Sequence, residues 1–305
     1  MELTAAVLQL NAAAEPSRLR LLVALLGGEA TVGDLVSVLD QSQPRVSRHL
    51  RLLAEAGLLE SFREGRSSYY RWSTAGFESG IVNSVAALGG SPDPTLVGDR
   101  QRLQKLSGQR ERDALRRALR SGRARGLHAS DADSVSADLI RSLPGAPQLD
   151  DILHVGCGSG ELLRRLLPES RTLVGTETSG PLRQVARARL RQAGLPRWTI
   201  RDASPSVLPF EAGEFDLVII QDALGTGPAT SLQKTLSEAA RVLRPAGTLL
   251  ILDRILPTDG ELSPRLGALG FTITRRQWLP GRAPDRALFL ATRGATNFTR
   301  TGTDD

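Results

Sequence analysis

The chain has 305 residues, which is too long for one ordinary domain and too short for three, so two domains and a connector are expected. Its 40% hydrophobic and 24% charged residues describe a folded globular chain rather than a disordered one. The formal net charge of +6 does not by itself identify a nucleic-acid-binding domain, so only local clusters of basic residues can do so.

The composition also excludes several classes of site. Cys157 is the single cysteine, which excludes an internal disulfide framework and a multi-cysteine zinc site, and the three histidines lie far apart in the sequence. The first residues carry no basic n-region, and no apolar run approaches the roughly 20 residues that a membrane span needs. We therefore expect a cytoplasmic protein without a metal and without membrane contact.

The patterning divides the chain into four parts. Residues 1–75 are helical and end in an alternating aromatic stretch, and residues 76–148 form a helical connector with an arginine-rich helix from about 98 to 121. Residues 149–293 alternate short apolar runs with helical patterns, which is typical of βαβ units around a parallel sheet. Residues 294–305 are a tail. We expect a multi-domain chain in which an α+β domain precedes an α/β domain.

Two short helices in the first part are joined by a tight turn. Thr31 and Asp34 form a capping-box-like helix start, and Asp40 lies in the turn, where aspartate tolerates a left-handed conformation. Pro44 then opens the next helix, in the first turn, where its missing N–H costs nothing. This arrangement predicts a helix-turn-helix.

The second of these helices has two different faces. Val46, Leu50 and Leu53 form an apolar stripe that must face the core. Arg48 and Arg51 point the opposite way, and such a face can contact guanine edges and phosphates in a major groove. The alternative is an ordinary solvated helix face.

A hairpin follows this helix. Residues 58–62 and 67–72 alternate as strands, and a turn containing Gly65 joins them. A hairpin directly after a helix-turn-helix makes a winged helix, with Arg63 and Arg66 at the wing tip beside the DNA backbone. We expect base reading by Gln43, Arg45, Ser47 and Arg48, and phosphate contact by Arg51, Arg63 and Arg66.

Residues 15–22, 42–50, 53–58 and 63–66 resemble the ArsR family of transcriptional regulators. The resemblance implies a homodimer that binds a near-palindromic double-stranded DNA operator and acts as a repressor. The best-known members bind metal through a cysteine pair on the helix before the turn, and residues 29–34 contain no cysteine. Metal sensing is therefore not expected. The helix expected over 74–88, together with the amino-terminal helix, is the predicted dimer surface.

The α/β part begins with a ligand-binding pattern. The strand 151–155 is followed by a turn containing Gly156, Gly158 and Gly160, where glycines let the backbone approach a ligand and point N–H groups at it. The second strand, 172–176, ends in Glu177, seventeen residues after Gly160. An acidic residue at about this offset accepts hydrogen bonds from ribose hydroxyls; a dinucleotide site and a surface carboxylate are the alternatives.

Five further strands are predicted over 198–201, 215–220, 248–253, 271–274 and 287–291. The ordered set resembles a Rossmann-like class I S-adenosylmethionine-dependent methyltransferase domain of the small-molecule type. The resemblance implies that the three glycines line the methionine part of the cofactor, that Glu177 holds the ribose, and that Asp202 binds the adenine amino group. The implied cofactor site is completed by His154, Thr178, Ala203 and Gln221.

The sequence departs from that family in two places. His154 stands two residues before Gly156, where relatives usually have a carboxylate near the cationic end of the cofactor, so the local field favours the cation less. We therefore expect S-adenosylhomocysteine to bind more tightly than S-adenosylmethionine. Leu224 is followed by glycine where active relatives often place histidine, and no catalytic residue can be named. Cys157 is interpreted as a small packed residue rather than a nucleophile.

The combined motifs favour a DNA-binding transcriptional regulator, of repressor type, whose methyltransferase-like domain binds S-adenosylhomocysteine or S-adenosylmethionine as effector. The alternative is an active small-molecule methyltransferase that carries an ArsR-type DNA-binding domain. A pure dimerisation scaffold ranks last. Residues 100–125 connect the two domains and are the expected carrier of coupling between them.

Overall fold

The protein is described by a computed structural model that covers residues 2–120, 137–138, 140–141, 150–166, 172–194, 197–224, 229–253, 259–279 and 286–294. The expected tail beyond residue 294 and residues 121–125 of the expected coupling segment lie outside the described residues. By their internal contacts the residues form two compact units, Met1–Leu127 with Ser179–Arg201 and His128–Thr178 with Asp202–Asp305.

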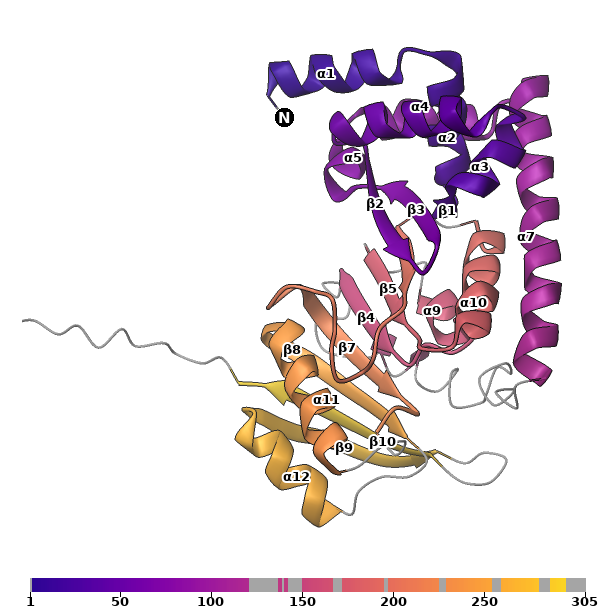
Figure 1. Cartoon of the computed structure of the whole chain (residues 1–305). Coiled ribbons are helices and arrows are strands. Elements are labelled where there is room, and N and C mark those ends of the chain that lie inside the picture. The colour runs from indigo at the N-terminus through magenta and orange to yellow at the C-terminus, as the bar shows by residue number, and fades with distance from the viewer. Residues whose placement is uncertain are drawn as a thin grey trace, which may run out of the picture. The chain divides into compact units, whose positions relative to one another are not determined.

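The first unit contains a winged helix and further helices that pack against it. A three-stranded sheet of order β1-β3-β2 carries the predicted hairpin, in which Gly65 turns the chain with a φ of 55° (Figure 1). The elements are α1 (Leu3–Ala13), α2 (Pro16–Leu25), β1 (Ala30–Thr31), α3 (Val32–Leu39), α4 (Gln43–Glu55), β2 (Leu59–Glu64), β3 (Ser67–Trp72), α5 (Thr74–Glu78), α6 (Ile81–Gly89), α7 (Pro94–Arg120), α10 (Gly180–Gln192) and β6 (Trp198–Arg201).

Local signals in the sequence set the helix-turn-helix. The Thr31 hydroxyl accepts from the Asp34 amide at 3.1 Å, and the Asp34 carboxylate accepts from the Thr31 amide at 3.0 Å, which is the predicted capping box at the start of α3. Asp40 ends that helix with a φ of 54°. Val46 and Leu50 are completely buried in the core below α4, as the apolar stripe predicts.

The helix expected from residue 74 to 88 is divided into α5 and α6. Ser79 adopts an extended conformation, with φ −73° and ψ 142°, and its hydroxyl donates to the Gly76 carbonyl at 2.6 Å, which ends α5. The arginine-rich helix α7 starts at Pro94, earlier than expected, because the Asp93 carboxylate caps it by accepting from the Thr95 and Leu96 amides at 2.9 and 3.1 Å.

Helix α7 packs along α10 within the first unit, as Figure 1 shows. Small residues allow the close approach: Ala114 and Ala118 of α7 are completely buried against Leu182 and Val185 of α10. This placement ties α10, the helix that follows the strand ending before Glu177, to the winged-helix part of the chain.

The second unit is built on a mostly parallel sheet, in which the strands of this unit have the order β5-β4-β7-β8-β10-β9. Strands β4, β5, β7 and β8 are parallel, whereas β10 is antiparallel to both β8 and β9. This is the predicted Rossmann-like architecture. The elements of this unit are β4 (Asp151–Val155), α9 (Glu161–Leu166), β5 (Thr172–Thr176), β7 (Phe215–Gln221), α11 (Ala229–Val242), β8 (Leu243–Asp253), α12 (Asp259–Ala268), β9 (Phe271–Leu279) and β10 (Arg286–Arg293).

Strand β8 starts earlier than the sequence pattern indicates. Leu243 already pairs with Phe215 of β7, and the register then shifts so that Thr248 pairs with Leu217. Ala246 lies inside this irregularity with a φ of 63°. Among the helices that the structure describes, none is long and apolar enough to cross a bilayer.

Candidate functional site

The outer face of α4 is the candidate DNA-binding surface. Gln43, Arg45, Arg48 and Arg51 are exposed there and Ser47 is half-buried, whereas Val46 of the opposite stripe is completely buried. The structure therefore presents four of the five predicted α4 contacts to solvent from one helix. Their donors suit phosphate oxygens and the acceptor edge of guanine.

His49 lies at the inner border of that surface. Its Nδ1 is 3.7 Å from the Glu15 carboxylate, and its side chain is 13% exposed. Burial lowers the pKa of His49, the nearby Arg18, Arg45 and Arg48 lower it further, and Glu15 alone opposes them. The imidazole is therefore held in its neutral form near pH 7.

The wing carries the other two predicted contacts. Arg63 and Arg66 are both exposed, on either side of the turn at Gly65. Between them, Glu64 is largely buried because two guanidinium groups of α10 hold its carboxylate: Arg183 Nε donates at 3.0 Å and Arg187 Nη2 at 2.5 Å. The wing tip is thus anchored from α10.

Arg187 is the centre of a buried network that the sequence analysis did not find. Its Nε donates to Glu29 at 2.6 Å, its Nη1 to the Tyr69 hydroxyl at 3.2 Å, and its Nη2 to the Ile200 carbonyl at 2.6 Å. Burial alone would lower the pKa of Arg187, but the carboxylates of Glu29 and Glu64 raise it, so the charge is retained.

A sequence signal for this network did exist. Arg183, Arg187 and Arg191 are spaced four residues apart, which places three guanidinium groups on one face of α10. The spacing could not identify the residues that pair with these arginines, because Glu29 and Glu64 lie more than a hundred residues from Arg187 in the chain.

The candidate cofactor site lies in the second unit, where β4, β5 and β7 end. The amides of Gly156 and Cys157 donate to the Thr176 carbonyl at 2.9 and 3.0 Å, and the Gly158 amide donates to Glu177 Oε2 at 3.1 Å. The glycine turn is therefore bonded directly to the end of β5, and the structure brings the predicted ribose carboxylate against it.

The glycines of this turn are required by its geometry. Gly156, Gly158 and Gly160 have φ values of 76°, 55° and 77°, which side chains disfavour. A Cβ at Gly156 would lie 2.3 Å from the Gln221 carbonyl oxygen, so the ends of β4 and β7 nearly touch.

The remaining predicted residues occupy related positions. Thr178 and Asp202 are exposed, Ala203 is buried, and Gln221 is half-buried as the last residue of β7. Asp202 and Ala203 directly follow β6. Thr178 and Gln221 therefore lie at or beyond the carboxyl ends of the parallel strands β5 and β7, the edge at which open α/β sheets bind ligands.

His154 and Cys157 are both enclosed by the fold. His154 is completely buried in β4, opposite Gly175 of β5 and Ile219 of β7. Cys157 is 5% exposed, which fits a packed residue. No group of three or more histidine, cysteine or acidic side chains that could hold a metal occurs within the described residues.

This edge of the sheet offers a ligand two kinds of contact. The glycines of the turn carry no side chains, so a ligand can lie close to its backbone, and the Glu177 carboxylate has two oxygens able to accept from hydroxyl groups. These residues fit an adenosyl cofactor, because the turn presents glycine backbone without side chains and the carboxylate suits a ribose diol.

Comparisons with known proteins find relatives of both the helix-turn-helix part and the α/β part of the chain. The sequence model of the bacterial regulatory protein, arsR family, matches residues 15–61, and that of a methyltransferase domain matches residues 152–247. The Escherichia coli arsenical resistance operon repressor is 54% identical over 46 residues, covering 15% of this chain and 39% of the repressor. A ubiquinone/menaquinone biosynthesis C-methyltransferase from Allorhizobium ampelinum is 34% identical over 106 residues, covering 33% of this chain and 40% of the enzyme.

Among solved structures, an amino pentose methyltransferase from Micromonospora echinaspora aligns with a TM-score of 0.45 at 18% identity, over 57% of this chain and 96% of that one. This chain spans 39% of the repressor's length and 40% of the C-methyltransferase's length. The chain is thus a fusion of an ArsR-type helix-turn-helix domain with a methyltransferase domain of Rossmann-like fold.

Proposed function

We propose that this fusion is a transcriptional repressor whose methyltransferase domain binds S-adenosylhomocysteine or S-adenosylmethionine as an effector. In this function the α4 face and the wing bind operator DNA, and the nucleoside bound at the glycine turn changes the affinity for that DNA. The product, S-adenosylhomocysteine, is the preferred effector, because His154 replaces the usual carboxylate near the cationic sulfur.

One observation carries the proposal. Helix α10 begins at Gly180, three residues after Glu177. It contacts the wing through the ion pairs of Arg183 and Arg187 with Glu64. A ligand that moves the end of β5 would displace the segment that leads into α10, the helix whose Arg183 and Arg187 hold the hairpin. Both ion pairs are largely buried, so the connection is not screened by solvent.

The residues of the proposed nucleoside site have separate roles. Gly156, Gly158 and Gly160 line the methionine part, Glu177 accepts from the ribose hydroxyls, and Asp202 accepts from the adenine amino group. The neighbouring positions Thr178, Ala203 and Gln221 enclose the ligand, and His154, which is completely buried in β4, acts on it through the local field.

We assign the DNA contacts as follows: Gln43, Arg45, Ser47 and Arg48 read bases, and Arg51, Arg63 and Arg66 bind phosphates. A homodimer is part of the proposal, because helix-turn-helix proteins read half-sites about 10 base pairs apart. Its support is an apolar stripe on α1 formed by Leu3, Val7 and Leu10, which are spaced four and three residues apart and are 82%, 48% and 59% exposed. These side chains fit the same stripe of a second copy.

The second candidate function is a working small-molecule methyltransferase that uses its DNA-binding domain only for docking or autoregulation. The match to a methyltransferase domain over residues 152–247 favours it. Methyl transfer depends mainly on positioning the acceptor, so the lack of a nameable catalytic base does not disfavour it. Turnover of S-adenosylmethionine with a panel of acceptors distinguishes the two.

Fluorescence anisotropy tests the proposal. The protein first selects a duplex from a random-sequence pool, and its affinity for that duplex is then titrated with each nucleoside. We expect S-adenosylhomocysteine to shift the DNA Kd by about 5- to 150-fold, the usual range of allosteric coupling, and S-adenosylmethionine to act only at higher concentration. Identical curves with the two nucleosides would refute the discrimination, and no shift with either would favour the enzyme.

A further inference from the structure

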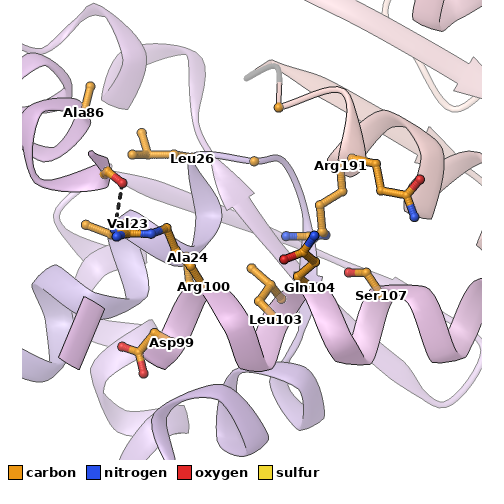
Figure 2. A pocket seen from close by; sticks show the side chains of 14 residues that line it. Val23, Ala24, Leu26, Ala86, Asp99, Arg100, Leu103, Gln104, Ser107 and Arg191 are labelled. Carbon is orange, nitrogen blue, oxygen red and sulfur yellow. Dashed lines mark hydrogen bonds between the residues drawn. The ribbon is translucent and has the colours of Figure 1, made fainter. Parts of the chain in front are cut away.

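A cavity with a volume of about 520 Å³ lies within the first unit, among α2, α6, α7 and α10 (Figure 2). Cavities that bind small organic ligands have volumes of about 300–1,000 Å³ and mostly apolar walls with few polar groups. The apolar wall of this one is formed by Val23, Ala24, Leu26, Ala86 and Leu103. Its size and lining therefore fit a small organic molecule.

The polar part of the lining is positively charged. Arg100 donates to the carbonyls of Gly89 and Ser91 at 2.7 and 2.8 Å, and Arg191 donates to the Glu29 carbonyl. Carbonyl oxygens orient a guanidinium group but do not neutralise it. Two cationic side chains thus face the cavity with only neutral groups as their hydrogen-bond acceptors.

The carboxylate among the described lining residues does not balance these charges. Asp99 accepts from Arg20 at 2.7 and 2.8 Å and from Arg102 at 2.6 Å, so both of its oxygens are already engaged by other cations. Asp99 is therefore not available to pair with Arg100 or Arg191, and an anionic ligand could do so.

Arg191 marks the point where the anion would bind. Its Nη1 is buried without a hydrogen-bond partner, and a Cβ built at Gly27, another lining residue, would lie 3.9 Å from this atom. Burial lowers the pKa of Arg191, against the raising influence of Asp34 and Glu29. A buried charged donor left without a partner is costly, and a carboxylate oxygen is the acceptor that satisfies it best.

We infer that this cavity binds an organic monocarboxylate, whose apolar body contacts Leu26 and Leu103 and whose carboxylate accepts from Arg191. Figure 2 shows the Arg191 side chain of α10 pointing toward α7, so the ligand would bridge the two helices. A phosphate or other polyanion fits less well, because most of the wall offers it no donor. This cavity shares no lining residue with the glycine turn, so its ligand would bind independently of a nucleoside there.

Isothermal titration calorimetry on the full-length protein tests the inference, with octanoate as the probe and 1-octanol as its uncharged equivalent. We expect saturable binding of one octanoate per chain and markedly weaker binding of 1-octanol. The Arg191→Met variant keeps the packing of the side chain but removes the charge-assisted bond, and should bind octanoate about 10- to 100-fold more weakly.

Two further variants keep the test decisive. Arg189→Met removes a guanidinium from the same helix, one that pairs with Glu111 outside the cavity, and should leave octanoate affinity unchanged. Ala86→Phe adds bulk at an exposed lining position and should abolish binding without disturbing the core. Saturating S-adenosylhomocysteine should not displace octanoate, whether or not that nucleoside regulates DNA binding. Equal affinity for octanoate and 1-octanol, wild-type affinity in Arg191→Met, or competition with the nucleoside would each overturn the inference.

Discussion

Replacing Arg187 with methionine should destabilise the first unit more than any other single charge removal on α10. Arg187 bonds two carboxylates, and the side chains of Arg187, Glu29 and Glu64 are 7%, 0% and 9% exposed. Removing one partner of a buried pair costs about 3–5 kcal/mol, because the remaining charge stays buried without compensation. Arg187 also lies 4.2 Å from the centre of the Tyr69 ring, so the loss of that cation–π contact adds to the cost.

Urea unfolding followed by tryptophan fluorescence measures this cost, since Trp72 and Trp198 are buried in the first unit. The matched control is Arg189→Met, which breaks an ion pair with Glu111 that is 3.6 Å long and partly exposed, and should cost about 0–1 kcal/mol. Adding Glu29→Gln to Arg187→Met should recover part of the loss, because it removes the completely buried carboxylate that Arg187 had neutralised, whereas Glu64 keeps its bond from Arg183. Equal destabilisation by the two methionine variants would refute this view of the network.

Three other predictions follow from the sites. Arg48→Ala should weaken binding to the selected duplex by about 1–3 kcal/mol and relax base preference, whereas Arg66→Ala should weaken binding to all DNA sequences alike. If both variants lost the same affinity on the selected and the random duplexes, the assignment would be contradicted. The folded state lowers the pKa of His49, so the stability it contributes is present above the unfolded pKa of about 6.5 and is lost as pH falls toward the folded value. Thermal melts should accordingly show a smaller loss of Tm between pH 7 and pH 5 for His49→Gln than for the wild type. An equal loss of Tm in the two proteins would contradict this role of His49. Gly156→Ala places a Cβ 2.3 Å from the Gln221 carbonyl oxygen at a φ of 76° and should abolish binding of both nucleosides in calorimetry, while retained binding would remove the glycine turn from the site.

Much of the fold could be predicted because its signals are local. The capping box at Thr31, the left-handed turn at Asp40 and the apolar stripe of α4 each depend on residues within a few positions, and the structure confirms them. The boundary between α5 and α6 was missed because it depends on the extended conformation of Ser79, a residue without a strong propensity to end a helix.

The contacts of α10 could not be predicted in the same way. Periodicity places α10 as the crossover helix after the second strand of the α/β part, but its partners are chosen by tertiary packing. Ala114 and Ala118 of α7 admit it closely, and Glu29 and Glu64 bind its arginines. The cavity around Arg191 is a consequence of that packing and has no pattern of its own in the sequence.

Reciprocal binding tests the central claim most directly, because linkage requires DNA and effector to change each other's affinity by the same factor. The measurement is calorimetric titration of S-adenosylhomocysteine into the full-length protein, alone and in complex with saturating selected duplex. We expect the two Kd values to differ by the same factor, within about 5- to 150-fold, by which the nucleoside shifts the DNA Kd in anisotropy. Equal Kd values for the free and the DNA-bound protein would contradict the claim that the methyltransferase domain regulates the winged helix.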